Sequence, residues 1–123
     1  MAILSRFLGG VVASYTGVGG TAVVLDLGFV PAYATGIDQA DGFVTWYWCN
    51  AFGGVTGGST ATGLVASSSV VAGLGTIATI AAGAGGIIAL DGSAGTGIGL
   101  TIGTDTSINR AGHGVIVFAH EPM

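Results

Sequence analysis

The sequence predicts an all-β protein that forms a single antiparallel β-sandwich. Short segments rich in β-branched and aromatic residues alternate with turns that contain Gly and Asp, a pattern typical of sandwiches and barrels. The 123 residues suffice for one hydrophobic core and are too few for two. Glycine supplies 25 of them and gathers between the candidate strands and in a central Gly/Ala/Ser-rich segment, which disfavours long helices.

The first half of the chain offers four candidate strands. They are residues 11–16 (VVASYT), 21–25 (TAVVL), 32–37 (AYATGI) and 43–50 (FVTWYWCN). Pro31 cannot donate a ladder hydrogen bond, so it marks the start or the edge of a strand. The sequence DQADG, residues 38–42, contains the residue types that turns require.

The clearest of these strands is residues 43–50. Strand periodicity places Trp46 and Trp48 on one face and Tyr47 and Cys49 on the other. Both faces are apolar, so we expect the core to cover one and a second sheet or a neighbouring subunit to cover the other. The two tryptophans are candidate partner contacts, and packing in a core or a subunit interface is favoured over stacking on a ligand.

The second half of the chain is less regular. Three candidate strands are residues 86–90 (GIIAL), 99–103 (GLTIG) and 115–120 (VIVFAH), with Asp91-Gly92 as a turn and residues 104–112 as a connection. Residues 51–86 are of low complexity, and register is weakly specified in Gly-rich sequence, so no element is assigned there.

Composition and charge point to an assembly. Charged residues make up 7 % of the chain, the formal net charge is −4, and lysine is absent. A folded chain of this size exposes about 6,000 Å², which eight charged side chains cannot cover, so we expect an obligate oligomer. With Arg6 and Arg110 as the only lysine or arginine residues, nucleic acid is excluded as a partner. The sequence has one cysteine, Cys49, which we expect to be a buried thiol. Because a disulfide needs two cysteines, an intrachain disulfide is excluded.

A membrane protein is an alternative. Residues 64–90 carry no charge and are long enough to cross a bilayer as a helix. Glycine, serine and threonine interrupt this stretch, and no Lys or Arg flanks it, which argues against the alternative.

No catalytic, cofactor or metal site is predicted. The glycine-rich GTGIG, residues 95–99, leads into a strand-like segment instead of the helix that a phosphate-binding loop requires. His113 and His120 are seven residues apart in an extended segment, about 20 Å, so they cannot share one metal or one triad. The protein is therefore expected not to be an enzyme.

Three stretches at the two ends of the chain share a pattern. They are residues 14–33 (SYTGVGGTAVVLDLGFVPAY), 41–48 (DGFVTWYW) and 99–120 (GLTIGTDTSINRAGHGVIVFAH). Together they resemble a β-sandwich module of tailed-bacteriophage virion proteins, which has a Y-T-G-N-G turn, an L-G-F-x-P corner and a closing segment G-F-x-I-G-x-D-x-x-V-N-x-x-G. Residues expected to shape turns in this pattern are Gly17, Gly28, Pro31, Gly103, Asp105, Asn109 and Gly112. Val18 stands where the pattern has Asn, and Gly114 and Phe118 replace closing aromatics.

The resemblance implies a structural role in a virion. Such modules serve as head decoration (cement) proteins or as parts of tail fibres and receptor- or glycan-binding appendages, and a chain of 123 residues suits the stand-alone decoration protein. We then expect a jelly-roll-like sandwich over residues 11–123, a homotrimer on the phage head, and an N-terminal arm, residues 1–10, that contacts the major capsid protein. The expected arm contacts are Ile3, Arg6, Phe7 and Leu8.

Overall fold

The computed structural model describes residues 1–40, 44–49, 62–68, 75–81, 85–93, 95–106 and 108–122. Over these residues the chain forms antiparallel β-strands joined by turns, in two sheets, and it contains no helix. The strands are β1 (Ala2–Phe7), β2 (Gly10–Thr16), β3 (Val23–Asp26), β4 (Tyr33–Asp38), β5 (Val44–Cys49), β6 (Thr62–Ser68), β7 (Gly75–Ala81), β8 (Ile87–Asp91), β9 (Ile98–Ile102) and β10 (Gly114–His120). The all-β sandwich predicted from the sequence is confirmed.

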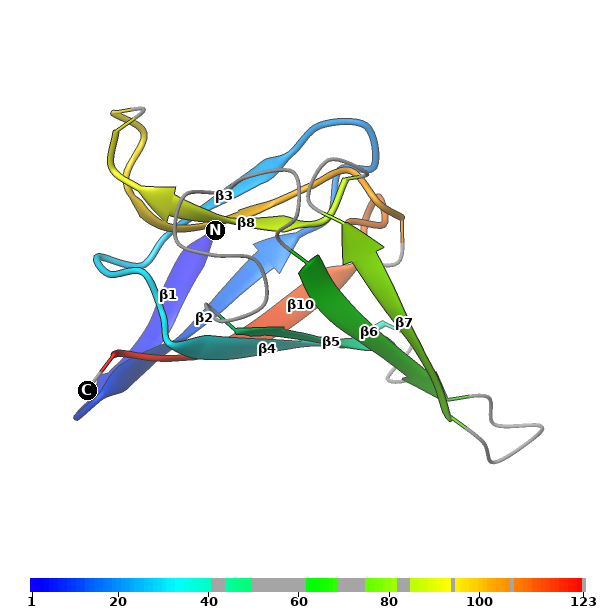
Figure 1. The fold of residues 1–123 in the computed structure, drawn as a ribbon, viewed down its shortest axis with the longest axis horizontal. Helices are drawn as coiled ribbons and strands as arrows, with labels where there is room; N and C mark the ends of the chain where they lie inside the picture. Colours follow the sequence, from blue (N-terminus) through cyan, green and yellow to red (C-terminus); the bar gives the residue numbers. More distant parts are fainter. Residues whose placement is uncertain are drawn as a thin grey trace.

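The two sheets differ in size. The larger has the order β1-β2-β10-β4-β5-β6-β7 and the smaller has the order β3-β9-β8. Figure 1 shows the smaller sheet lying across one side of the larger one, with β6 and β7 rising steeply from β5. This curl brings β6 beside β8, so the larger sheet wraps around the core at that end.

The chain crosses between the sheets near both ends. β2 and β10 pair with each other in the larger sheet. β3, which follows β2, and β9, which precedes β10, pair with each other in the smaller sheet. The strands β4, β5, β6 and β7 follow one another in one sheet as a meander. The jelly-roll-like form of the sandwich stays a prediction.

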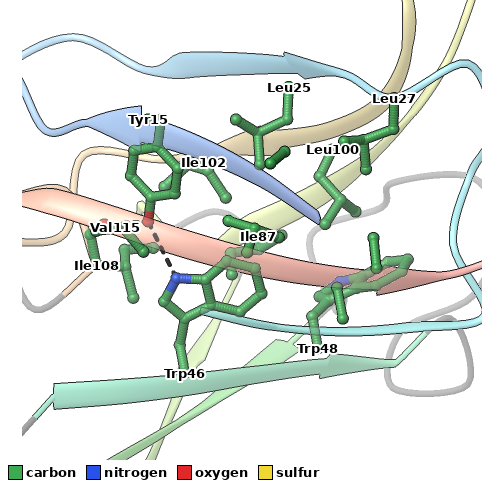
Figure 2. Close-up of a cluster of buried hydrophobic side chains, with 14 of the residues drawn as sticks. Tyr15, Leu25, Leu27, Trp46, Trp48, Ile87, Leu100, Ile102, Ile108 and Val115 are labelled. Carbon is green, nitrogen blue, oxygen red and sulfur yellow. Dashed lines mark hydrogen bonds between the residues drawn. The ribbon is translucent and has the colours of Figure 1, made fainter. Parts of the chain in front are cut away.

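The core lies between the sheets. Alternate residues of β2 and β10 point inward from the larger sheet, and those of β3, β8 and β9 meet them from the smaller one. Trp46 and Trp48 are 1 % and 3 % exposed, on the same face of β5, as strand periodicity predicts. Figure 2 shows both indoles beneath Leu25, Leu27 and Leu100 of the smaller sheet and its corner.

One expectation needs correction, and the observed strands bear on one alternative. Residues 1–10 do not form an arm separate from the sandwich, because Ala2–Phe7 pairs with β2 as the edge strand of the larger sheet, with a bulge between Ile3 and Ser5. The described parts of residues 64–90, the stretch that the membrane alternative would need as a helix, are the strands β6, β7 and β8 and the turn residues 85 and 86. No helix long and apolar enough to cross a membrane occurs among the described residues.

Candidate interaction surface

Five of the seven residues expected to shape turns come together at one end of the sandwich: Gly17, Gly103, Asp105, Asn109 and Gly112. The loop after β2 lies against the connection between β9 and β10: the amide of Gly17 donates to the carbonyl of His113, and the amide of Gly112 donates to the carbonyl of Gly17. A Cβ at Gly17 would overlap the backbone of Arg110, which restricts this position to glycine. The Y-T-G and D-x-x-x-N-x-x-G stretches, about 90 residues apart in sequence, therefore form one structural unit.

Asn109 is the centre of this unit. Its side chain is fully buried, and its Oδ1 accepts hydrogen bonds from the amides of Val18 and Gly19 at 2.7 and 3.4 Å. Its Nδ2 donates to the carbonyls of Thr21 and Gly103 at 2.8 and 2.9 Å. All the hydrogen-bonding capacity of a buried amide is directed at backbone, so Asn109 holds the two loops together.

The other turn residues have equally local roles. Gly28 and Gly112 adopt φ of +85° and +80°, which favour glycine. The carbonyl of Asp105 accepts from the amides of Ile108 and Asn109, and Pro31 is buried just before β4. A Cβ at Gly103 would overlap the backbone of Gly85. None of these contacts forms a reactive arrangement.

A carboxylate–imidazole pair joins the start of β10 to the end of β4. Asp38 is buried, and its Oδ2 lies 2.8 Å from Nδ1 of His113, while its Oδ1 accepts from the amide of Ala40. His120 lies at the opposite end of β10, so the structure keeps the two histidines apart. No group of three His, Cys, Asp or Glu side chains that could hold a metal ion occurs in the described part of the chain.

One candidate surface is the side of β2, β10, β4 and β5 that points away from the core, together with Phe7 of β1. We call it the outer face. Its described side chains are Phe7, Val12, Ser14, Thr16, Tyr33, Thr35, Ile37, Tyr47, Cys49, Ile116, Phe118 and His120. Tyr33 and Tyr47 are 51 % and 47 % exposed, and Ile37 and Phe118 are also exposed. No Asp, Glu, Lys or Arg belongs to this described set.

Strand pairing aligns these side chains in rows. One row runs Gly10, His120, Tyr33 and Cys49 across β2, β10, β4 and β5. The His120 ring stacks on Tyr33 with centroids 4.3 Å apart and meets Phe7 edge-on at 5.8 Å. A Cβ at Gly10 would overlap the Phe7 ring, so the glycine lets that ring lie against β2. The next row contains Val12, Phe118, Thr35 and Tyr47.

The structure separates the six expected partner contacts into three groups. Trp46 and Trp48 belong to the core of this chain and are not available to a ligand or partner at its surface. Ile3 packs partly against the core, and Nη1 of Arg6 lies 3.5 Å from the carbonyl of Leu27. Phe7 is exposed on the outer face, and Leu8 is fully exposed at the tip of the β1–β2 hairpin.

Sequence reasoning missed the Phe7–His120–Tyr33 cluster. Its three rings come from the chain's first strand, its last strand and β4, so no sequence motif contains them together. The sequence feature that could have indicated the cluster is the one noted for residues 43–50. A strand with two apolar faces is expected to be covered on both, one by the core and the other by a second sheet or subunit. Tyr33, Ile37, Ile116 and Phe118 repeat that signal in β4 and β10.

Comparisons with protein-family models, curated proteins and solved structures find no match to this chain.

Proposed function

We propose that this chain is a non-enzymatic structural protein of a tailed-bacteriophage virion, a decoration (cement) protein that stabilises the head as a homo-oligomer, with a trimer as the expected assembly. The observation that carries the proposal is the outer face, which is broad, aromatic and free of charge over its described residues. Contiguous apolar surface of this kind marks interaction sites, because a free monomer rarely exposes it. Its repeated burial over a capsid would stabilise the shell by about 25 cal/mol per Å² before ordering costs.

The module resemblance supports the same role. Its Y-T-G and D-x-x-x-N-x-x-G motifs build the loop junction centred on Asn109. Residues with this function specify a sandwich scaffold and leave its faces for contact. A sandwich with an uncharged contact face suits a structural protein that acts by binding to other subunits.

The β1–β2 hairpin tip is the proposed contact with the major capsid protein. Leu8 is fully exposed there and Phe7 lies next to it, so an apolar anchor projects from the edge of the larger sheet. Removing residues 1–10 would delete an edge strand as well as this anchor, and a point substitution is therefore the sharper test. Leu8→Asp is expected to lower occupancy on purified heads, whereas Val18→Asp, at an exposed apolar position in another loop, is expected to leave occupancy unchanged.

The decisive measurement is the copy number in purified virions. Quantitative mass spectrometry is expected to find hundreds of copies per particle, as a head decoration protein requires. A few to tens of copies would instead assign the chain to the tail, and absence from virions would refute the proposal. Equal loss of occupancy in Leu8→Asp and Val18→Asp would remove the hairpin tip as the capsid contact.

A receptor- or glycan-binding appendage is the second candidate. Trp46 and Trp48 do not favour it, because both are buried. The exposed rings of Tyr33 and Tyr47 do, because half-exposed aromatic rings beside hydroxyl groups such as that of Thr35 suit sugar stacking. Glycan-array binding that Tyr33→Ala and Tyr47→Ala abolish, together with a tail copy number, would select this candidate.

A further inference from the structure

We infer that the outer face is the surface through which two copies of this chain associate. The inference rests on the proposed function for the role of the oligomer and names the partner of a specific surface. It gives a two-fold pair where the proposed function expects a trimer, because contact between the same face of two chains has two-fold symmetry. The occupant is a second copy of this chain, packed sheet against sheet. Three features support this choice: the chemistry of the face, the position of the charges, and the size of the face.

The chemistry of the face suits an apolar partner. Phe118 lies at its centre, paired in register with Val12 on one side and Thr35 on the other. Tyr47 continues this row and Ile37 lies in the next one. Aligned sheets pack about 10 Å apart through interdigitating apolar side chains of this type, so a second outer face presents a chemically matching surface.

The position of the charges favours a second copy. Asp26 and Asp91 lie on β3 and β8 of the smaller sheet, and Asp105 and Arg110 lie in the connection between β9 and β10. The chain carries a net charge of −4, so two copies repel each other wherever their acidic side chains come close. Contact through the outer faces leaves the described charges of the smaller sheets on the far sides of the pair, where repulsion is weakest.

The size of the face suits a weak, reversible association. Four strands at about 4.8 Å spacing and six residues at about 3.3 Å rise give a projected area of about 400 Å². Protruding aromatic side chains increase the accessible area above the projected value. Two such faces fall in the range of transient interfaces, which bury less than about 1,200 Å² in total.

The test uses the full chain in solution with a matched pair of variants. Phe118 and Val24 are 37 % and 38 % exposed, Phe118 on the outer face and Val24 on β3 of the smaller sheet. Sedimentation equilibrium is expected to show wild-type oligomers at micromolar concentration. Phe118→Glu is expected to raise the dissociation constant about tenfold or more, because a buried charge would meet an apolar partner. Val24→Glu is expected to leave it unchanged within about twofold.

A second readout protects the test against a variant that fails to fold. Tyr47→Glu introduces the same charge at a different strand of the face and is expected to weaken association as Phe118→Glu does. Cys49, the one cysteine of the sequence, lies on the outer face opposite Tyr33. In the wild-type protein its rate of reaction with a thiol reagent is expected to fall as the protein concentration rises through the association range.

Several results would overturn the inference. They are a wild-type protein that stays monomeric, equal weakening by Phe118→Glu and Val24→Glu, and a Cys49 reaction rate that is independent of concentration. A monomeric wild type whose capsid occupancy depends on Phe118 would assign the face to the capsid protein instead. Oligomers in solution with no protein in virions would refute the proposed function alone, and hundreds of copies per virion from a monomeric chain would refute this inference alone.

Discussion

At the scale of single residues, two buried polar side chains determine how the loops and the core fit together. Asn109 joins the loop after β2 to the connection between β9 and β10 through four hydrogen bonds to backbone. Tyr15 donates its hydroxyl proton to the carbonyl of Ile108 at 2.6 Å and accepts from Nε1 of Trp46 at 3.0 Å (Figure 2). Each side chain links segments that are distant in sequence, so each should influence global stability.

Asn109→Ala is expected to lower the free energy of unfolding by about 3 kcal/mol. The truncation leaves two amides and two carbonyls without their side-chain partner in a buried site, and unmade buried hydrogen bonds are costly. Urea denaturation measures the change. Thr106→Ala, at an exposed position in the same connection, is the control and should change stability by less than about 0.5 kcal/mol. Similar stabilities of the two variants would contradict the role given to Asn109.

Tyr15 makes stability depend on alkaline pH. Burial, with a smaller contribution from the nearby negative charge of Asp38, raises the pKa of the Tyr15 hydroxyl above its usual range, while the bond from Trp46 opposes the shift. The unfolded chain therefore loses this proton at lower pH than the folded chain. The free energy of unfolding is constant with respect to this group below about pH 10 and falls above it, by up to about 1.4 kcal/mol per pH unit.

Denaturation curves on both sides of about pH 10 test this effect. Tyr15→Phe is expected to be less stable at neutral pH by about 1–2 kcal/mol, because Trp46 and Ile108 lose their partner. The variant should also lose the contribution of Tyr15 to the alkaline slope, while the exposed Tyr33 and Tyr47 remain in both proteins. An identical slope in the two proteins would show that Tyr15 is not the group responsible.

At the scale of elements, strand pairing depends on glycines that admit large side chains. Gly36 of β4 lies opposite Trp46 of β5, and a Cβ at this position would overlap the indole ring. Gly10 has the same relation to the Phe7 ring on the other side of the sheet. These glycines let aromatic rings cover neighbouring strands, one ring in the core and one on the outer face.

Gly36→Ala is expected to destabilise the fold by about 1–3 kcal/mol, because the added methyl group must displace Trp46 within a packed core. Gly20→Ala is the matched control, since an added Cβ there meets nothing within 4 Å. Thermal unfolding followed by tryptophan fluorescence compares the two variants. Equal melting temperatures would show that β4 and β5 adjust without cost.

At the scale of the whole molecule, the described charged and apolar surfaces are segregated. The described outer face of the larger sheet has no charge. The described charges of that sheet are Arg6, whose Nη1 lies near the carbonyl of Leu27, and Asp38, which is buried at the end of β4. The other described charges occur on the smaller sheet, in the connection between β9 and β10 and at the C-terminus. Association through an uncharged face should respond to salt differently from association through ion pairs. Screening would reduce only the repulsion between chains of net charge −4.

The dissociation constant of the oligomer is accordingly expected to stay constant or to fall as the NaCl concentration rises from about 0.05 to 0.5 M. Sulfate, which strengthens apolar burial, should lower it further. Sedimentation equilibrium across this series provides the measurement. Weakening of association by salt would indicate an interface made of ion pairs, away from the outer face.

Much of the fold follows from local sequence. β-branched and aromatic segments between turns predicted β2, β3, β4, β5, β8, β9 and β10 with boundaries that differ by one or two residues from those observed. Two-residue periodicity also assigned Trp46 and Trp48 to one face, because side-chain alternation is a property of any extended chain. β6 and β7 were not predicted: their Gly-, Ala- and Ser-rich sequences specify register weakly, and pairing with β5 and with each other defines these strands.

The sequence by itself determined the all-β class, most strands, the turn residues and the shortage of charge. Each depends on local propensity or on composition, which need no knowledge of distant contacts. The tertiary structure decided that residues 1–10 supply an edge strand, that both tryptophans belong to the core, and that Phe7, Tyr33 and His120 meet on one exposed face. These outcomes depend on which strands become neighbours in the two sheets. The order of the strands results from the burial of one shared core, and residues from both ends of the chain contribute to that core.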